Sequence, residues 1–191
     1  MAKIRLEHFD DATAVDELVA SAFGPGRFTK SAYRLREGVH PISSLSFVAE
    51  LGKRVVGTVR FWPIDIGGTR AIMLGPIAVE KSLQGQGIAL RLMQSGLDAA
   101  RGQEHRVAVL IGDEPYYARA GFKQIQPVGC VTMPGPVDPR RVLGLALLEG
   151  AMDGLRGEMR RVELHVGVVA MGASLAPLSA PSQQKPANDE G

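Results

Sequence analysis

The sequence predicts a single domain of the α/β (α+β) class built on a mixed sheet. Three apolar runs, 44–51, 54–66 and 71–79, are separated by the short turns "GK" and "GGTR", which predicts an antiparallel meander. A later run, 106–112, lacks polar alternation and so resembles a strand covered on both faces. Helical periodicity fills the interval before it. A strand, a crossover helix and a second strand form a βαβ unit, so 71–79 and 106–112 should run parallel.

The N-terminal part predicts a strand followed by two helices. Residues 3–9 are the strand, and Asp10 or Asp11 would cap a helix whose apolar residues recur at helical spacing until "GPG" at 24–26. A second, shorter helix is predicted over 29–38, beginning at Thr29 and ending at Gly38.

The crossover helix has a clear apolar stripe, expected to be buried: Ile88, Leu92, Met93, Gly96, Leu97 and Ala100. A short helix is predicted over 114–122, with Asp113 as its N-cap and Gly121 at its end. Edge strands are predicted in "KQIQPVG" and "VTM", and a further helix within 138–155.

Length and composition fit one domain with a tail. The chain has 191 residues, 45% of them hydrophobic and 22% charged. We expect the domain to cover 1–155, with its core at about 3–128. Segment 160–169 could add a strand, dock on a partner subunit or stay mobile. The Pro- and Ser-rich end, within 156–191, is expected to be disordered.

Charge and cysteine content limit the partners. The net charge of +2 is small and the basic residues are scattered, so no nucleic-acid partner is expected. Cys130 is alone and cannot form an internal disulfide, and neither a signal peptide nor a membrane-spanning run is evident. We therefore expect a cytoplasmic protein, with no membrane partner and no metal.

The stretch "QGQGIA" (84–89) joins a predicted strand to a predicted helix, where free amides and the helix dipole favour an anion such as phosphate. It is not a dinucleotide fingerprint, because position 90 is leucine, and no P-loop Gly-Lys-Ser/Thr occurs. Alternatively, Gly85 and Gly87 only allow a tight connection.

Gln84, Gly87 and Ala89 fit the pattern Arg/Gln-x-x-Gly-x-Gly/Ala, and the segment resembles motif A of the GNAT superfamily of acyl-CoA-dependent N-acyltransferases. "YYARAGF" resembles its motif B, which has a tyrosine, here Tyr117, four residues before a Gly-Phe pair. The resemblance covers roughly 3–128. "FGPGRFTKSAYRLREG", "LGPIAV", "GDEPYYARAGF" and "MPGPVDPRR" are similar to a compact bacterial group of N-acetyltransferases.

The resemblance implies a GNAT fold with acetyl-CoA as co-substrate. It also implies a bulge that splays strand 71–79 from 106–112, and proline at position 76 agrees, because proline is disfavoured in a central strand without a bulge. The cofactor contacts would come from the strand end, the turn and one tyrosine: Ile77, Ala78, Val79, Gln84, Gly85, Gln86, Gly87, Ile88, Ala89 and Tyr116.

By the same resemblance, Tyr117 protonates the departing thiolate; the alternative is a core tyrosine. Candidate acceptor-pocket residues are Phe28, Tyr33 and Trp62. No general base stands out among Glu50, Asp113, Glu114 and His105: Asp113 suits a helix cap, Glu50 a solvated strand end and His105 an exposed turn, and water chains can serve instead. Ala120 replaces the aromatic residue expected before Gly121, which suggests a looser pocket or a different acyl chain.

These features predict an N-acetyltransferase that moves an acetyl group from acetyl-CoA to a primary amine of a small molecule or protein. Transfer would be direct within a ternary complex, in a monomer or homodimer. Two alternatives remain: a non-catalytic acyl-CoA-binding sensor, and an acyltransferase that uses a longer acyl-CoA or an acyl carrier protein. Cys130 is not expected to be a nucleophile.

Overall fold

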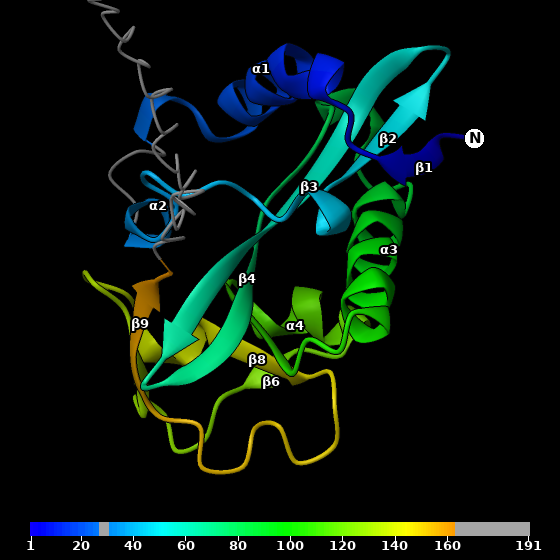
Figure 1. Ribbon diagram of the computed structural model, residues 1–191. Helices are drawn as coiled ribbons and strands as arrows, with labels where there is room; N and C mark the ends of the chain where they lie inside the picture. Colours follow the sequence, from blue (N-terminus) through cyan, green and yellow to red (C-terminus); the bar gives the residue numbers. More distant parts are fainter. Residues whose placement is uncertain (27–30, 163–191) are drawn as a thin grey trace, which may run out of the picture.

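The computed structural model describes residues 1–26 and 31–162 and shows a mixed sheet with helices on both faces (Figure 1). The main strand order is β1-β2-β3-β4-β5-β8-β6. The bounds are β1 Lys3–Leu6, β2 Phe47–Leu51, β3 Arg54–Ile66, β4 Thr69–Val79, β5 Val107–Ile111, β8 Val142–Ala146 and β6 Lys123–Gln124. Strands β1 to β4 are antiparallel neighbours, whereas β4 and β5 are parallel, which confirms the predicted meander and βαβ unit.

Two further strands lie beside the C-terminal end of β3, which extends past its pairing with β2. Strand β9 (Gly157–Arg161) pairs antiparallel with Ile64–Ile66 of β3, and β7 (Val131–Thr132) pairs with β9. Each predicted edge strand is present over two residues: Lys123–Gln124 of 123–129 pairs with β8, and Val131–Thr132 of 131–133 pairs with β9. The part of segment 160–169 from residue 163 onward, and the predicted disordered tail, lie outside the described residues.

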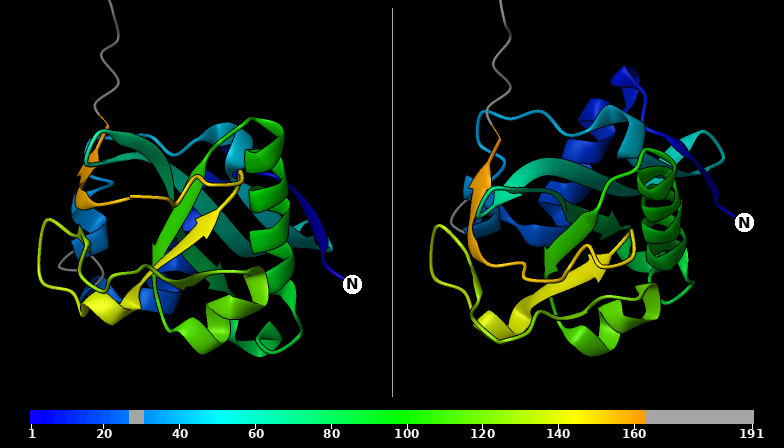
Figure 2. Two further views of the ribbon diagram at one scale, coloured as in Figure 1. Left: turned by 90° about the horizontal axis from the view of Figure 1, so that it is seen from below. Right: turned by 60° about the horizontal axis from the view of Figure 1, so that its bottom comes forward.

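The helices lie on opposite sides of the central strands. Helix α3 (Ile88–Gly102) packs on one face, while α1 (Ala12–Phe23) and α2 (Ser31–Arg34) lie over the other (Figures 1 and 2). A short α4 (Glu114–Tyr117) continues into a 3-10 turn at Ala118–Ala120 and ends at Gly121, which has a φ of 91°.

Each face of the sheet has its own hydrophobic core. The six residues predicted to form the stripe of α3 are the six that the structure buries on this helix. They pack against one side of β3 and β4, including Phe61 and Leu74. Because neighbouring strand residues alternate sides, Trp62 and Met73 enter the second core, which also contains Leu35. The α2 region is thereby anchored against the face opposite α3.

A bulge interrupts β4 where the proline predicts one. Val59 pairs with Ile77 and Phe61 pairs with Leu74, so Gly75 and Pro76 together lie opposite one residue of β3. The parallel ladder between β4 and β5 is confined to Ile72–Ala108 and Met73–Val109. Beyond these pairs the two strands separate, which confirms the predicted splay.

The predicted helix within 138–155 is wrong. Residues Val142–Ala146 form β8, which pairs antiparallel with the whole of β5, and Figure 2 shows the two strands side by side. An apolar run of this length fits a buried strand as well as a helix, and the open edge of β5 decides the outcome. Within β8, Gly144 leaves room for Met152, whose Cε would lie 2.5 Å from an added Cβ.

Some N-terminal predictions also need correction. The first strand ends at Leu6 rather than residue 9, and a 3-10 turn, Phe9–Asp11, precedes α1. Of the helix predicted over 29–38, the described part is helical only over Ser31–Arg34, and Thr29 lies outside the described residues.

Three polar side chains behave differently from the prediction. Asp113 makes no capping hydrogen bond at the start of α4; its carboxylate instead lies 3.1 Å from Nε of Arg141. Glu50 accepts a hydrogen bond from Arg5 at 2.8 Å rather than being freely solvated. His105 is half-buried, and burial lowers its pKa.

Asp11 ties the start of α1 to β1. Its carboxylate accepts hydrogen bonds from Arg5 at 2.6 and 2.9 Å and from the His8 amide at 2.7 Å, which hold the pKa of Asp11 below its ordinary value. The side chain thus caps the 3-10 turn rather than α1 itself.

Asp11→Asn is expected to lower the free energy of unfolding at pH 7 by about 1 to 3 kcal/mol, because it breaks charge-assisted hydrogen bonds of a buried group. A carboxyl with a lowered pKa stabilises the fold above its ordinary pKa, near 3.8, and loses this effect as pH falls through the lower folded value. In urea unfolding, the difference in stability between the wild type and Asp11→Asn should therefore be constant above about pH 3.8 plus one unit and shrink as the pH falls below the ordinary pKa of 3.8. Exposed Asp10→Asn is the control, and an equal loss in both variants would contradict this role.

Candidate active site

Two cavities meet beside the splayed strands. The larger has a volume of about 910 Å³ and extends between the α1–α2 region, β3, β4 and β5. The smaller, about 470 Å³, follows the end of β4 into the turn before α3. Four residues line both: Phe23, Ile77, Tyr116 and Tyr117. A reaction between two molecules, one in each cavity, would take place at this junction.

The smaller cavity collects nearly all the residues predicted to contact a cofactor. Its lining includes Ile77, Ala78, Val79, Gln84, Gly85, Gly87, Ile88, Ala89 and Tyr116. Gln86 is exposed and is not among the lining residues. The side chain of Gln84 turns back to donate a hydrogen bond to the carbonyl of Val79 at 3.2 Å, which closes the turn against β4.

The turn leaves its backbone open to a guest. Gly85 and Gly87 have φ values of 79° and 76°, and no protein atom lies within 4 Å of where a Cβ would stand on either. Protein packing therefore does not require glycine at these two positions. The left-handed backbone favours glycine, and a ligand lying close to the backbone would require it. Gly87 directly precedes α3, whose first amides lack partners within the helix and whose first turn carries no acidic residue. Arg119 adds a cation to the lining. The arrangement suits phosphate groups.

Tyr117 is held at the junction by the packing of its ring against two neighbours. Its ring lies against Gly112, where an added Cβ would clash with it, and makes an edge contact with Phe122 at 6.4 Å between centroids. Burial, reinforced by Tyr116 and Asp113, raises the pKa of the Tyr117 phenol above its ordinary value. The hydroxyl is thus a proton donor at neutral pH.

The neighbouring Tyr116 lines the same two cavities, with its ring 84° from that of Tyr117 and 5.0 Å away between centroids. It is 44% exposed, whereas Tyr117 is half-buried. The two adjacent tyrosines are therefore distinguished by burial rather than by access to the cavities.

The larger cavity contains two of the three residues predicted for an acceptor pocket. Tyr33 and Trp62 both line it, and Phe28 lies outside the described residues. The indole Nε1 of Trp62 donates a hydrogen bond of 2.6 Å to the carbonyl of Gly75. This bond fixes the ring against the bulge of β4. Cys130 lines neither cavity, and its thiol contacts the carbonyl of Leu155 at 3.4 Å.

Of the candidate bases, only Asp113 lines a cavity, and it is paired with Arg141. Glu50, Glu114 and His105 line neither cavity.

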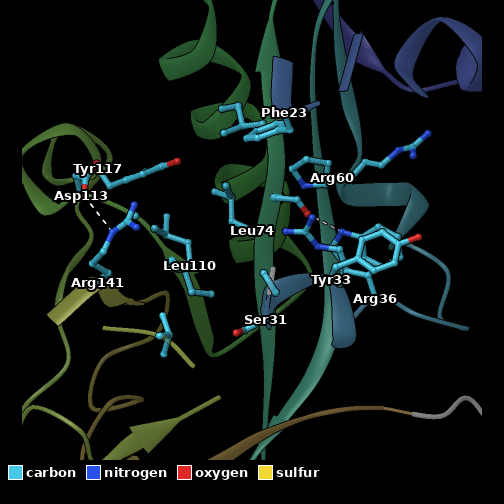
Figure 3. A pocket seen from close by; sticks show the side chains of 18 of the residues that line it. Phe23, Ser31, Tyr33, Arg36, Arg60, Leu74, Leu110, Asp113, Tyr117 and Arg141 are labelled. Carbon is cyan, nitrogen blue, oxygen red and sulfur yellow. Dashed lines mark hydrogen bonds and ion pairs between the residues drawn. The ribbon is translucent and has the colours of Figure 1, made fainter. Parts of the chain in front are cut away.

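Sequence reasoning missed three arginines of the larger cavity: Arg36, Arg60 and Arg141. Arg60 pairs with Glu7, its Nε 3.0 Å from a carboxylate oxygen, and with Asp16 at 3.2 Å. Figure 3 shows Arg36 and Arg60 on the side of the cavity opposite Tyr117 and Arg141. Arg36 and Arg141 lie in the segments "FGPGRFTKSAYRLREG" and "MPGPVDPRR", but no pattern in either segment singles out the arginine, and Arg60 looks like an ordinary surface charge in the sequence.

In the part of the chain that the structure describes, no group of three or more His, Cys, Asp or Glu side chains is placed to hold a metal ion. The same residues contain no helix with the length and apolar character needed to cross a membrane.

A bulged strand splayed from its parallel neighbour, next to an open glycine turn before a helix, is the arrangement expected of N-acyltransferases that take acyl groups from a CoA thioester. Residues 12–122 match the acetyltransferase (GNAT) family, and this match covers more than half of the chain. The chain therefore belongs to the GNAT family of acetyltransferase enzymes.

Relatives in sequence and structure agree. The uncharacterized N-acetyltransferase YhbS of Escherichia coli K12 is 33% identical over 122 residues, which cover 63% of this chain and 72% of YhbS. The structure of Escherichia coli YhbS in complex with CoA superposes with a TM-score of 0.72, at 28% identity over 84% of this chain and 89% of that one. A GNAT acetyltransferase from Brucella melitensis in complex with acetyl-CoA superposes with a TM-score of 0.63, at 29% identity over 85% of this chain and 96% of that one.

Proposed function

We propose that this protein transfers an acetyl group from acetyl-CoA to a primary amine of a small molecule or protein. The observation that carries the proposal is the meeting of the two cavities at Tyr117: the smaller suits a phosphate-bearing donor and the larger suits an acceptor. Two similar structures contain CoA or acetyl-CoA, which supports the same assignment.

In this proposal the turn from Gln84 to Ala89 holds the pyrophosphate of CoA through its backbone amides, and Arg119 adds a positive charge. The pantetheine arm lies along Ile77–Val79, where β4 has no ladder partner on the β5 side. An extended chain with amide groups can use the backbone hydrogen-bonding groups left open there.

Acetyl-CoA supplies an activated thioester when bound. The acceptor amine, held in the larger cavity, attacks the thioester carbonyl, so that a C–N bond forms and the C–S bond breaks. Tyr117 donates its phenolic proton to the leaving sulfur, the attacking amine loses a proton to solvent water, and the Tyr117 phenolate regains a proton from solvent. Because the pKa of Tyr117 is raised, its phenol stays protonated throughout the neutral pH range.

Thermal melts with acetyl-CoA, ATP and NADH test the donor site. Acetyl-CoA at about 100 times its dissociation constant should add roughly 2.7 kcal/mol to the free energy of unfolding, whereas ATP and NADH should add much less. No selective shift with acetyl-CoA would contradict the proposal.

A screen of amines and lysate proteins with labelled acetyl-CoA then tests transfer. Label should pass to primary amines. Binding of acetyl-CoA without any transfer would favour the non-catalytic sensor instead, and transfer only from longer acyl-CoAs or acyl carrier protein would revise the donor.

A further inference from the structure

Arg36 occupies an unusual position in the larger cavity. It follows the buried Leu35 and lies over the ring of Trp62, with its guanidinium carbon 5.9 Å from the ring centroid. One terminal nitrogen stands 3.0 Å from where Gly75 would carry a Cβ. Glycine at this bulge position therefore leaves room for the guanidinium beside β4.

Among the described residues, the Arg36 guanidinium has no anionic partner. Its Nε is buried and makes no hydrogen bond, and among the described residues no carboxylate lies within 4.0 Å of its nitrogens. The other two arginines of this cavity, Arg60 and Arg141, are each paired with acidic side chains. Burial lowers the pKa of Arg36 to about 10, so the group is still a cation at neutral pH.

A cation that is largely removed from solvent and has no counter-charge is costly, because desolvation is not offset by pairing. Contact with the Trp62 ring compensates only in part. The cost would be recovered if an anion entered the cavity, since a guanidinium edge binds carboxylate or phosphate through two parallel hydrogen bonds.

We propose that Arg36 binds the anionic group, a carboxylate or a phosphate, of a small amine acceptor. This inference rests on the proposed acetyl transfer and names the substrate class of the same site. Arg36 and Tyr117 lie on opposite sides of the cavity (Figure 3), so a molecule with its anion at Arg36 extends its amine toward the junction. A volume of about 910 Å³ is ample for such a molecule.

Trp62 offers a direct measurement of binding. It is the single tryptophan of the chain and lies under the Arg36 guanidinium, so its fluorescence reports on this part of the cavity without any turnover. The probes are β-alanine, 4-aminobutyrate and 6-aminohexanoate, each paired with its primary amide, which lacks the carboxylate, and O-phosphoethanolamine, paired with ethanolamine, which lacks the phosphate. Titrations are made in the presence of CoA.

At least one probe with an anionic group should change the emission of Trp62 saturably and bind tenfold or more tightly than its match without the anionic group. The carboxylate and phosphate arms show which anion is preferred. Arg36→Gln should abolish this selectivity and Arg36→Lys should keep part of it. Arg70→Gln, which removes an exposed arginine of β4 outside both linings, should behave as the wild type. Equal responses to every probe with an anionic group and its match, or no response at all, would overturn the inference.

Steady-state transfer from acetyl-CoA separates this inference from the proposed function. The amine that carries a carboxylate or phosphate should have the higher kcat/KM in the wild type, and Arg36→Gln should lose this advantage mainly through KM, with little change in kcat. Equal transfer to amines with and without the anionic group refutes the role of Arg36 and leaves acetyl transfer standing. Anion-selective binding without transfer to any amine refutes the proposed function instead.

Discussion

Tyr117→Phe is expected to retain stabilisation by acetyl-CoA and to lower kcat by about 10²- to 10⁴-fold, the usual contribution of a positioned proton donor. Phenylalanine preserves the ring packing against Gly112 and Phe122 but has no proton to give to the leaving sulfur. Thermal melts measure the first property and steady-state acetylation measures the second, so loss of folding cannot be mistaken for loss of chemistry.

Tyr116→Phe is the matched control, because this residue lines the same cavities but is more exposed. It should keep most of the activity, and the opposite pattern would transfer the role to Tyr116. The pH profile gives a second check. Burial disfavours the Tyr117 phenolate, so its pKa lies above the ordinary value near 10, and donation should persist as pH rises to that value. A loss of kcat attributable to Tyr117 well below pH 10 would contradict the assignment.

Much of the fold follows from local pattern. The stripe of α3 is fixed by helical periodicity, and the bulge at Gly75–Pro76 follows from the inability of proline to join a central ladder. Strand β8 shows the limit of this reasoning. Its apolar run is compatible with helix or strand, and only the free edge of β5, a feature of tertiary structure, selects the strand.

The candidate site also has one part that local sequence patterns predict and one part that they do not. The proposed donor side is encoded in a contiguous glycine pattern, because a backbone cradle needs particular residues at particular positions. The acceptor side is assembled from segments far apart in the chain, and the burial of Arg36 depends on the position of Trp62 and on the gap at Gly75. No local pattern shows that a charged residue just after a four-residue helix will lose its solvent.

The glycines of the turn before α3 matter because they leave the backbone accessible, and Gly87→Val should show this as a loss of CoA binding. The substitution puts a branched side chain into space where no protein atom lies within 4 Å, so the folded chain can hold it at the cost of backbone strain. The phosphates, however, could no longer approach the first amides of α3. We expect acetyl-CoA affinity to fall by about tenfold or more, as for a loss of roughly 1.4 kcal/mol or more.

Gly154→Val is the control that distinguishes backbone strain from a side chain blocking the approach of the phosphates. Gly154 has a φ of 71°, close to the 76° of Gly87, and also has no atom within 4 Å of a would-be Cβ, but it lines neither cavity. Both variants should lose similar thermal stability without ligand, roughly 1 to 2 kcal/mol for a side chain in this conformation. Only Gly87→Val should also weaken the acetyl-CoA-dependent shift and raise the KM for acetyl-CoA. If both variants bind acetyl-CoA like the wild type, the turn at 84–89 does not hold the donor phosphates, and the connection is tight for structural reasons alone.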